Sequence, residues 1–234
     1  MRRGGQLEAA FVLHRRAFRE TSALVELFTR EHGRVGLVAR GVRGKRARNA
    51  GVLQPFSRLS VSWSAQGELG TLTGVEAAGP VRGLSGRRLA SGFYLNELIL
   101  RLTRREDPLP ELFDRYAETL AALAGGAGEA PVLRLFERDL LAALGYGLQL
   151  ETDTTGARVT DDRHYRYELE HGPVPVGGAQ PGMLHLSGAS LLALASGHFG
   201  DADTEREALR LTRAALRLYL GDRPLKSREL LTRS

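Results

Sequence analysis

The spacing of apolar residues changes once along this chain, and the change separates two kinds of structure. Over the first 80 residues apolar and polar side chains alternate, as in Leu7, Ala9, Phe11 and Leu13. A period of two residues predicts strands that bury one face. From Gly86 onward the period becomes 3.6, which predicts helices that each bury one stripe. The sequence therefore predicts an α+β fold in which strands come first and helices follow.

Short apolar runs fill the first segment, and no long helix separates them. After the run at 7–13, further runs lie at 24–29, 35–39, 59–63 and 69–75. Five short strands in this order favour a small, partly open barrel, and the OB-fold is the five-stranded barrel that commonly binds oligonucleotides. The sequence thus predicts an OB-fold over 1–82. Its longest connection, 41–51, joins the third strand to the fourth.

A helical domain is expected over 83–150. The first helix has an apolar stripe of Leu95, Leu98, Ile99 and Leu102. The second helix follows Pro108 and Pro110, and its stripe is Leu112, Phe113, Tyr116, Leu120 and Leu123. The third helix begins at Pro131 and ends at Gly145, with a stripe of Val132, Phe136, Leu140 and Leu144. Each helix has only one apolar stripe. We therefore expect the three helices to pack on one another and on the flank of the barrel.

A third segment, 151–234, is expected to hold a small hairpin and further helices. Residues 155–170 read as a hairpin that turns at Asp161 and Asp162, and the Gly- and Pro-rich stretch 172–182 reads as a loop. A short helix is expected at 190–196. A longer one is capped by Asp203 or Thr204, with Glu207 completing a capping box. Its expected stripe is Leu209, Thr212, Leu216 and Leu220, and a last short helix follows Pro224.

Positive charge is concentrated near the start of the chain. The whole sequence carries 33 Lys and Arg against 27 Asp and Glu, a net +6, whereas residues 1–90 hold 16 cations and 6 acids. No Asp or Glu occurs from His32 to Gly67. Such a field attracts a polyanion, and nucleic acid is the expected partner. The alternative is a solvated loop whose arginines have no ligand.

Motifs of catalysis and of metal binding are missing from the sequence. The chain has no Cys, so thiolate metal sites and Cys nucleophiles are excluded. Gly44 and Lys45 do not complete a phosphate-binding loop, and no serine lies in a GxSxG elbow. Asp161, Asp162, His164 and His171 are better explained by a charged turn than by a metal site. We therefore expect a protein without enzymatic activity, bound metal or membrane segment, located in the cytoplasm.

Aromatic residues give a weaker indication of base stacking. Phe11, Phe28 and Trp63 fall on the expected inward face of strands and are assigned to the core. Phe18 and Phe56 lie outside that alternation, so they either stack on bases or anchor loops.

An ordered set of short motifs spans nearly the whole chain. It comprises Ala10–His14, Glu20–Ser22, Phe28–Thr29, Gly33–Val35, Val38–Arg43, Leu53–Phe56, Tyr94–Leu98, Phe136–Glu137, Leu144–Gly147, Tyr219–Gly221 and Leu225–Leu230. In this order the motifs resemble the RecO family of bacterial recombination mediators. The resemblance implies an OB-fold, a helical middle and a small C-terminal region. It also implies binding to single- and double-stranded DNA, annealing of complementary strands, and partnership with RecR and with the acidic tail of the single-strand binding protein SSB, so that RecA is loaded.

The chain departs from the family at the zinc site. Many members carry CxxC pairs shortly after the motif that matches Leu144–Gly147, but here the corresponding positions are Thr152 and Thr155. Threonine does not hold zinc in such a site. The resemblance therefore implies a zinc-free branch with a degenerate zinc-ribbon-like hairpin, in which packing alone holds the C-terminal region.

Candidate binding residues follow from the charge pattern and the resemblance together. The expected DNA contacts are Arg34, Arg40, Arg43, Lys45, Arg46 and Arg48, and Lys226 and Arg228 are possible additions. Arg134 and Arg138, beside the stripe of Phe136 and Leu140, are candidates for the SSB tail, although a solvated helix face explains them equally well. Two other functions remain open, an RNA-binding OB-fold protein and a scaffold whose basic loop grips an acidic partner.

Overall fold

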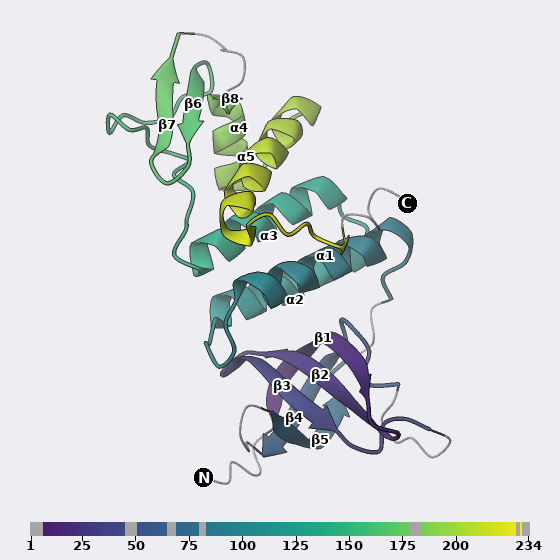
Figure 1. The fold of residues 1–234 in the computed structure, drawn as a ribbon. Coiled ribbons are helices and arrows are strands. Elements are labelled where there is room, and N and C mark those ends of the chain that lie inside the picture. The colour runs from purple at the N-terminus through teal and green to yellow at the C-terminus, as the bar shows by residue number, and fades with distance from the viewer. Residues whose placement is uncertain are drawn as a thin grey trace. The chain divides into compact units, whose positions relative to one another are not determined.

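The computed structural model describes residues 7–44, 51–64, 69–79, 83–177, 184–227 and 230. Its elements form two compact units (Figure 1). The first contains Met1–Gly125 and Leu225–Ser234, and the second contains Gly126–Pro224. This division differs from the segments 1–82, 83–150 and 151–234 that the sequence suggests, and those segments stay a prediction of domain boundaries.

The first unit contains the five-stranded barrel that the sequence predicts. Its strands are β1 (Glu8–Phe18), β2 (Ser22–Thr29), β3 (Gly33–Ala39), β4 (Arg58–Ser64) and β5 (Gly70–Ala77). They close in the order β1-β2-β3-β5-β4, with β3 and β5 parallel and the other neighbours antiparallel. The α+β class and the OB-like barrel are therefore confirmed. The barrel is closed, whereas the sequence suggested a partly open one.

Alternation along the strands fills the barrel with aliphatic side chains. Val25 and Leu27 of β2 and Leu37 of β3 are buried in the interior, while Leu24 and Glu26 point outward and are half-buried. The register of β1 against β2 shifts between Val12 and His14. Such a bulge changes which residues of a strand face the core. Trp63 packs partly buried against the interior, in agreement with its assignment to the core.

Two helices cover one part of the outer face of the barrel. They are α1 (Gly86–Leu102) and α2 (Pro110–Ala124). Phe11 and Phe28 are buried as predicted, but they pack outward against Phe113, with ring centroids 5.3 and 5.6 Å away. The predicted stripe of α2 is buried throughout. The apolar faces of barrel and helix therefore share one core layer.

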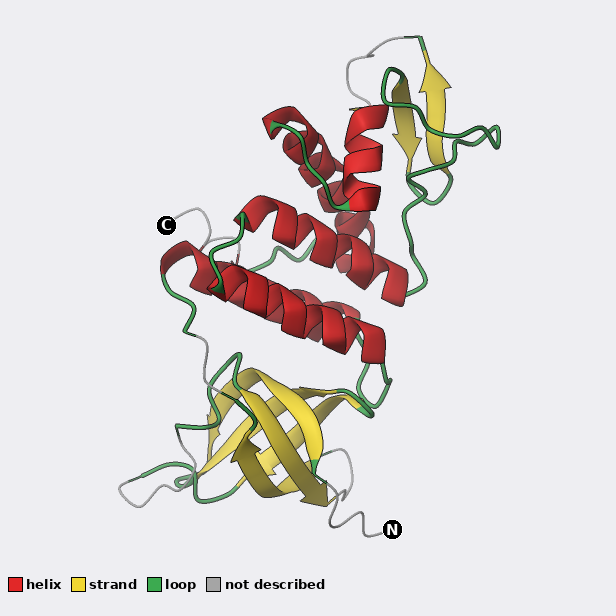
Figure 2. Ribbon diagram, turned by 180° about the vertical axis from the view of Figure 1, so that it is seen from behind, coloured by secondary structure: helices red, strands yellow, loops and turns green. Residues whose placement is uncertain are grey.

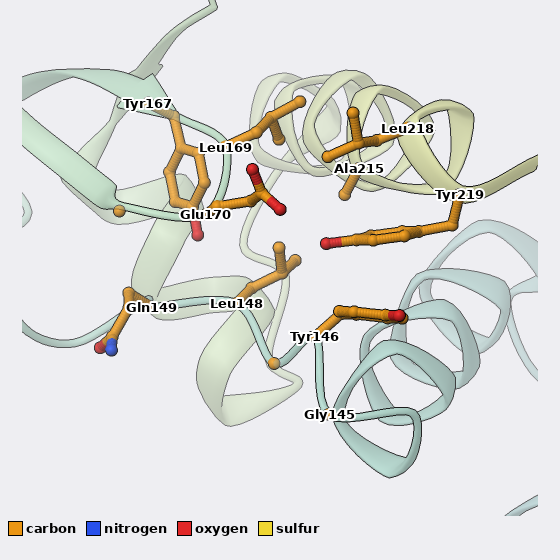
Figure 3. Close-up of a pocket in the computed structure, with 12 residues that line it drawn as sticks. Gly145, Tyr146, Leu148, Gln149, Tyr167, Leu169, Glu170, Ala215, Leu218 and Tyr219 are labelled. Carbon is orange, nitrogen blue, oxygen red and sulfur yellow. The ribbon is translucent and has the colours of Figure 1, made fainter. Parts of the chain in front are cut away.

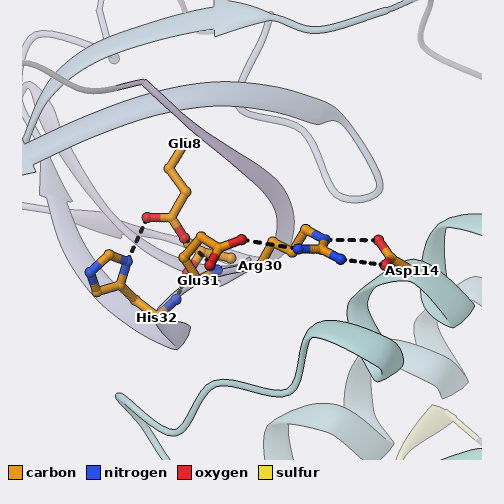
Figure 4. Close-up of polar contacts among 6 residues, drawn as sticks. Glu8, Arg30, Glu31, His32 and Asp114 are labelled. Atoms are coloured by element: carbon orange, nitrogen blue, oxygen red, sulfur yellow. Dashed lines mark hydrogen bonds and ion pairs between the residues drawn. The ribbon is translucent and has the colours of Figure 1, made fainter.

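Polar contacts fix the two helices to the barrel. Tyr116 of α2 donates to Asn96 of α1 at 2.5 Å, and Asn96 donates to the carbonyl of Leu13 in β1 at 2.7 Å. The guanidinium of Arg30, in the turn between β2 and β3, pairs with both carboxylate oxygens of Asp114 at 2.9 and 3.2 Å (Figure 4).

The last described residues of the chain also belong to the first unit. The carboxylate of Glu97 in α1 accepts the backbone N–H groups of Lys226 and Ser227 at 2.9 and 2.8 Å, and the Ser227 hydroxyl at 2.6 Å. Leu225 and Ser227 are buried. The chain thus returns to the helices beside the barrel after completing the second unit.

The second unit combines helices with a small sheet. Its elements are α3 (Glu129–Ala143), β6 (His164–Glu168), β7 (Gly172–Val176), β8 (His185–Ser187), α4 (Gly188–Ser196) and α5 (Ala202–Leu220), which are red and yellow in Figure 2. α5 packs against both α3 and α4. The third predicted helix begins at Glu129, two residues before Pro131, because proline is tolerated in the first helical turn.

The predicted hairpin of this unit is wrong in its pairing. β6 pairs with β7, which lies in the stretch expected to be a loop, and Asp161 and Asp162 precede β6 without forming its turn. The sheet order is β7-β6-β8, so β7 is an edge strand. An edge strand accommodates Pro173 and Pro175, because one side of it needs no ladder donors.

The cap of α5 also differs from the prediction. Asp201 is the N-cap, and Thr204 completes the capping box. Glu207 instead accepts the backbone N–H and the hydroxyl of Ser187 at 2.7 and 2.9 Å. The buried stripe is Ala208, Leu211, Thr212, Ala215 and Leu216, whereas the expected Leu209 is 37% exposed.

A carboxylate organises the loop that contains Thr152 and Thr155. One oxygen of Asp153 accepts the Thr155 backbone N–H at 2.8 Å, the Thr155 hydroxyl at 2.6 Å and the Ala157 N–H at 3.1 Å. Gly156 supplies the positive φ of 86° that this turn requires. The Thr155 hydroxyl thus donates to a carboxylate of the protein itself. Among the described residues no three His, Cys, Asp or Glu side chains gather as metal ligands.

Within the described ranges of the chain, no helix is both long enough and apolar enough to cross a membrane.

Candidate nucleic-acid interface

Near the β1–β2 turn, the outer face of the barrel carries exposed side chains. On β1 the exposed His14 and Arg16 and the half-buried Phe18 point to this face. Arg16 lies opposite Leu24, and Leu24 lies opposite Val38 on β3. These side chains form a surface of cations and apolar groups that continues to the exposed Arg40 just after β3.

Arg15 points away from this outer face and binds both ends of the connection between β3 and β4. It lies opposite Val25, a residue of the barrel interior. Its guanidinium donates to the carbonyls of Val42 and Leu53 at 3.0 and 3.4 Å. A planar guanidinium suits this bridging role, because it presents several donors in fixed directions. Arg15 therefore links the two ends of the connection between β3 and β4.

The turn between β1 and β2 is joined to the same connection. The carbonyl of Thr21 accepts the backbone N–H groups of Val42 and Arg43 at 2.9 and 3.1 Å. The guanidinium of Arg43 donates to the carbonyl of Arg19 at 2.9 Å. These bonds bring cations from two loops onto one edge of the barrel. We call His14, Arg16, Phe18, Arg19, Arg40 and Arg43 the barrel patch.

Only part of the predicted DNA site lies in the described structure. Arg40, Arg43 and Lys226 are described, whereas Lys45, Arg46, Arg48 and Arg228 lie outside the described residues. The side chain of Lys226 is in an exposed position, while its backbone N–H is held by Glu97.

Arg34 is separated from the barrel patch. It lies near the opposite end of β3, where its guanidinium donates to the carbonyl of Leu100 and lies 3.9 Å from the carboxylate of Glu26. Burial lowers the pKa of Arg34 from its ordinary value, and Glu26 partly offsets this effect. Arg105 also pairs with Glu26, at 2.8 Å. The structure therefore assigns Arg34 to the contact between barrel and helices.

The two aromatic residues left open by the sequence have different surroundings. Phe56 packs its ring on Phe93 at 5.1 Å, and its backbone N–H donates to the carbonyl of Val12. It anchors a loop. Phe18 lies within the barrel patch, with the guanidinium of Arg19 5.1 Å from its ring centroid. Phe18 is thus the aromatic residue of the barrel patch, and its stacking on a base stays a prediction.

Three arginines of this edge are not among the DNA contacts that the sequence predicts. Arg15, Arg16 and Arg19 precede the acid-free stretch, and Glu20 and Glu26 follow them closely. A count of charge along the chain therefore overlooks them. Strand alternation puts Arg15 and Arg16 on opposite faces, and the bulge between Val12 and His14 makes Arg16 the outward one.

Arg134 and Arg138 both have partners within the second unit. The Arg134 side chain is 7% exposed and pairs with Glu137 at 2.5 Å. Arg138 donates to the carbonyls of Leu194 and Ala195, in the last turn of α4, at 2.8 and 2.7 Å. Cations at the C-terminus of a helix stabilise its unpaired carbonyls. The structure thus gives Arg134 and Arg138 roles in packing and in capping.

Charge is distributed unequally between the two units. The first unit carries 23 Lys and Arg against 13 Asp and Glu, a net +10, and the second carries 10 against 14, a net −4. A positive surface attracts phosphates, and contacts to phosphates carry no sequence information.

Comparisons with known proteins agree along nearly the whole chain. Residues 6–81 match the family model described as "Recombination protein O N terminal", and residues 84–229 match "Recombination protein O C terminal". A protein of Nitrosococcus oceani is 50% identical over 226 residues, which are 96% of this chain and 92% of that protein. One of Alkalilimnicola ehrlichii is 52% identical over 227 residues, 96% of this chain and 90% of that protein. One of Halorhodospira halophila is 48% identical over 230 residues, 97% of each chain. All three carry the name DNA repair protein RecO.

Proposed function

The chain belongs to the RecO family, and we propose that it acts in DNA repair as a recombination mediator. In this role it binds single- and double-stranded DNA without sequence specificity and anneals complementary strands. Together with RecR it helps to load RecA onto DNA coated with SSB. It works as a binding protein without catalysis, in the cytoplasm at the nucleoid.

The observation that carries this proposal is the barrel patch. Arg16, Arg19 and Arg40 hold their charges at exposed positions on one edge of the barrel, beside the aromatic ring of Phe18. Annealing requires a surface that screens the repulsion between two phosphate backbones. Guanidinium groups supply this screening, and they contact phosphates of any sequence.

The strength of the interaction depends on salt. If five cations each neutralise one phosphate of a single strand, the slope of log K against log[salt] is about −3.5. A fourfold rise in salt then weakens binding roughly a hundredfold. This steep dependence suits a protein that must bind and release DNA without regard to sequence.

RecR, SSB and RecA enter the proposal as partners through the family. An acidic SSB tail needs an accessible cation, and Arg134 and Arg138 are engaged by Glu137 and by the α4 carbonyls. A basic surface such as the barrel patch meets that electrostatic need better than these two residues. Lys226 adds an exposed cation to the same positively charged unit.

The test is annealing of two labelled complementary DNA strands, bare or coated with SSB. One variant replaces Arg16, Arg19 and Arg40 by Gln, and a second replaces Arg40, Arg43, Lys45, Arg46 and Arg48 by Ala. The matched control replaces Arg163, Arg213 and Arg217 by Gln, which removes three exposed charges from the second unit. We expect fast annealing by the natural chain and by the control, and at least tenfold slower annealing by both barrel variants.

Other outcomes would indicate a different function or a different binding site. No annealing by the natural chain at low salt would contradict the mediator role, and tighter binding to RNA of the same sequence would favour an RNA-binding protein through 2′-OH contacts. Equal loss in the control would mean that net charge, and not the barrel patch, controls binding.

A further inference from the structure

A pocket in the second unit is not used by the proposed function. It has a volume of about 210 Å³ and lies between the segment after α3, the β6–β7 turn and the last turns of α5 (Figure 3). Pockets for drug-sized molecules are typically larger, about 300 Å³ or more. The size therefore suits a single side chain of a partner.

Aromatic and aliphatic groups form the walls of this pocket. Tyr146 and Tyr219 stack with their centroids 3.8 Å apart and their planes at 16°. Tyr146 is 45% exposed and Leu218 is 49% exposed, so the rim presents apolar surface to solvent. Leu148 lines the pocket opposite the β6–β7 turn. These walls accept a flat group or an aliphatic chain.

A single carboxylate gives the pocket its charge. Glu170 is the one acidic residue among the twelve residues that line the pocket, and no Lys or Arg is among them. Within the part of the chain that the structure describes, its carboxylate makes no hydrogen bond or ion pair. Figure 3 shows it directed into the pocket toward Tyr219. Burial and the charge of Glu170 raise the pKa of the Tyr219 hydroxyl, in agreement with this proximity.

We propose that this pocket binds the side chain of an arginine presented by a basic segment of a partner protein. A guanidinium stacks on tyrosine rings and donates two parallel hydrogen bonds to a carboxylate. Its three methylene groups fit beside Leu148 and Leu218. Lysine, a compact point charge, would gain the ion pair but not the stacking.

Charge complementarity favours this occupant over an acidic one. Glu170 repels a carboxylate at close range, and the second unit as a whole carries −4. A negative unit attracts a basic segment before contact is made. The pocket is therefore a receptor for positive charge, in contrast to the barrel patch.

The test uses the full chain with ¹³C-labelled tyrosine rings, observed by NMR. Three blocked peptides of the form Gly-Ser-X-Ser-Gly carry arginine, its neutral isostere citrulline, or glutamate at X. We expect the arginine peptide to shift the Tyr146 and Tyr219 signals saturably, with an affinity at least tenfold above that of the citrulline peptide. Glu170→Gln should abolish this preference, whereas Glu151→Gln, which removes one exposed charge outside the pocket, should keep it.

Several outcomes would overturn the proposal. They are equal affinity for arginine and citrulline, tighter binding of the glutamate peptide, or full binding by Glu170→Gln. Dimerisation of the chain alone that depends on Glu170, measured by sedimentation, would contradict the proposal of a separate partner protein. It would place the arginine on a second copy of this chain. No DNA is present in these measurements, so their result is independent of the proposed annealing function.

Discussion

Arg15 and Arg16 are neighbours in β1 with different tasks. Arg15 donates to the carbonyls of Val42 and Leu53, whereas Arg16 is exposed on the barrel patch. Hydrogen bonds from a charged group to partly buried carbonyls are worth about 1.5–3 kcal/mol. We expect Arg15→Gln to lower the free energy of unfolding by about 2 kcal/mol, measured by urea denaturation.

Arg16→Gln is the matched control for Arg15→Gln. It should leave the unfolding free energy nearly unchanged and reduce the magnitude of the salt slope for single-stranded DNA by about 0.7, the share of one phosphate contact. A loss of stability in Arg16→Gln equal to that in Arg15→Gln would contradict the opposite orientations of the two side chains.

Phe18 should distinguish single strands from duplexes. Stacking of a base on an aromatic side chain contributes about 1–3 kcal/mol, and bases inside a duplex are not free to stack on it. We expect Phe18→Ala to weaken binding of a labelled single strand by roughly fivefold or more and to leave duplex binding nearly unchanged, as measured by fluorescence anisotropy. Phe18→Tyr keeps the ring and should retain the affinity. Equal losses for both DNA forms would indicate that Phe18 supports the fold of the patch.

At the scale of single residues, the sequence identifies burial better than it identifies partners. The alternation predicts that Phe11 and Phe28 are buried, but not that they pack outward on Phe113, because a helix distant in sequence provides that surface. Arg34 and Arg40 look alike in the sequence. They differ only because the fold brings the carbonyl of Leu100 and the carboxylate of Glu26 to Arg34.

At the scale of elements, a buried chain of hydrogen bonds links α2, α1 and β1. Burial raises the pKa of Tyr116, which therefore remains a protonated donor to Asn96. Removing its hydroxyl leaves the buried Asn96 oxygen without that donor, at a cost of about 1–3 kcal/mol. We expect Tyr116→Phe to lower the unfolding free energy by this amount in urea denaturation. Tyr146→Phe, at an exposed ring, is the control and should change it little.

The loop held by Asp153 should respond to acid. Its hydrogen bonds, first that of the Thr155 hydroxyl, lower the pKa of Asp153 from its ordinary value. A carboxylate with a lowered folded pKa stabilises the fold above its unfolded pKa of about 3.9, and this stabilisation is lost as pH falls through the folded pKa. Asp153→Asn should therefore have a lower Tm than the natural chain at pH 7. A difference in Tm that persists undiminished at pH 2–3 would show that the charge of Asp153 is not its source.

Local pattern explains which elements the sequence predicts. The barrel strands and the α2 stripe follow from periods of two and 3.6, which each segment carries by itself. β7 was missed because Gly172, Pro173 and Pro175 are typical of loops, and only its position at the sheet edge makes it a strand. The N-cap of α5 was predicted at the wrong residue, because Glu207 has the spacing of a capping box but accepts a hydrogen bond from Ser187.

At the scale of the whole molecule, the net charges of the two units have opposite signs. The barrel unit carries +10 and the second unit −4, although the chain as a whole carries only +6. The count along the sequence predicts this asymmetry, because most cations near the start remain in the barrel unit. The sequence does not predict that the chain returns through Lys226 and Ser227, which are held there by Glu97.

This separation predicts that DNA affinity depends on where a charge is removed. Replacing Arg16, Arg19 and Arg40 by Gln should reduce the magnitude of the log K–log[salt] slope for single-stranded DNA by about 2, because each lost phosphate contact contributes about 0.7. Replacing Arg163, Arg213 and Arg217 changes the net charge by the same amount but should leave the slope unchanged. Anisotropy titrations at several salt concentrations measure both slopes. Equal slopes for the two variants would mean that the overall charge of the chain holds the DNA, whereas unequal slopes would locate the counterion release on the barrel edge.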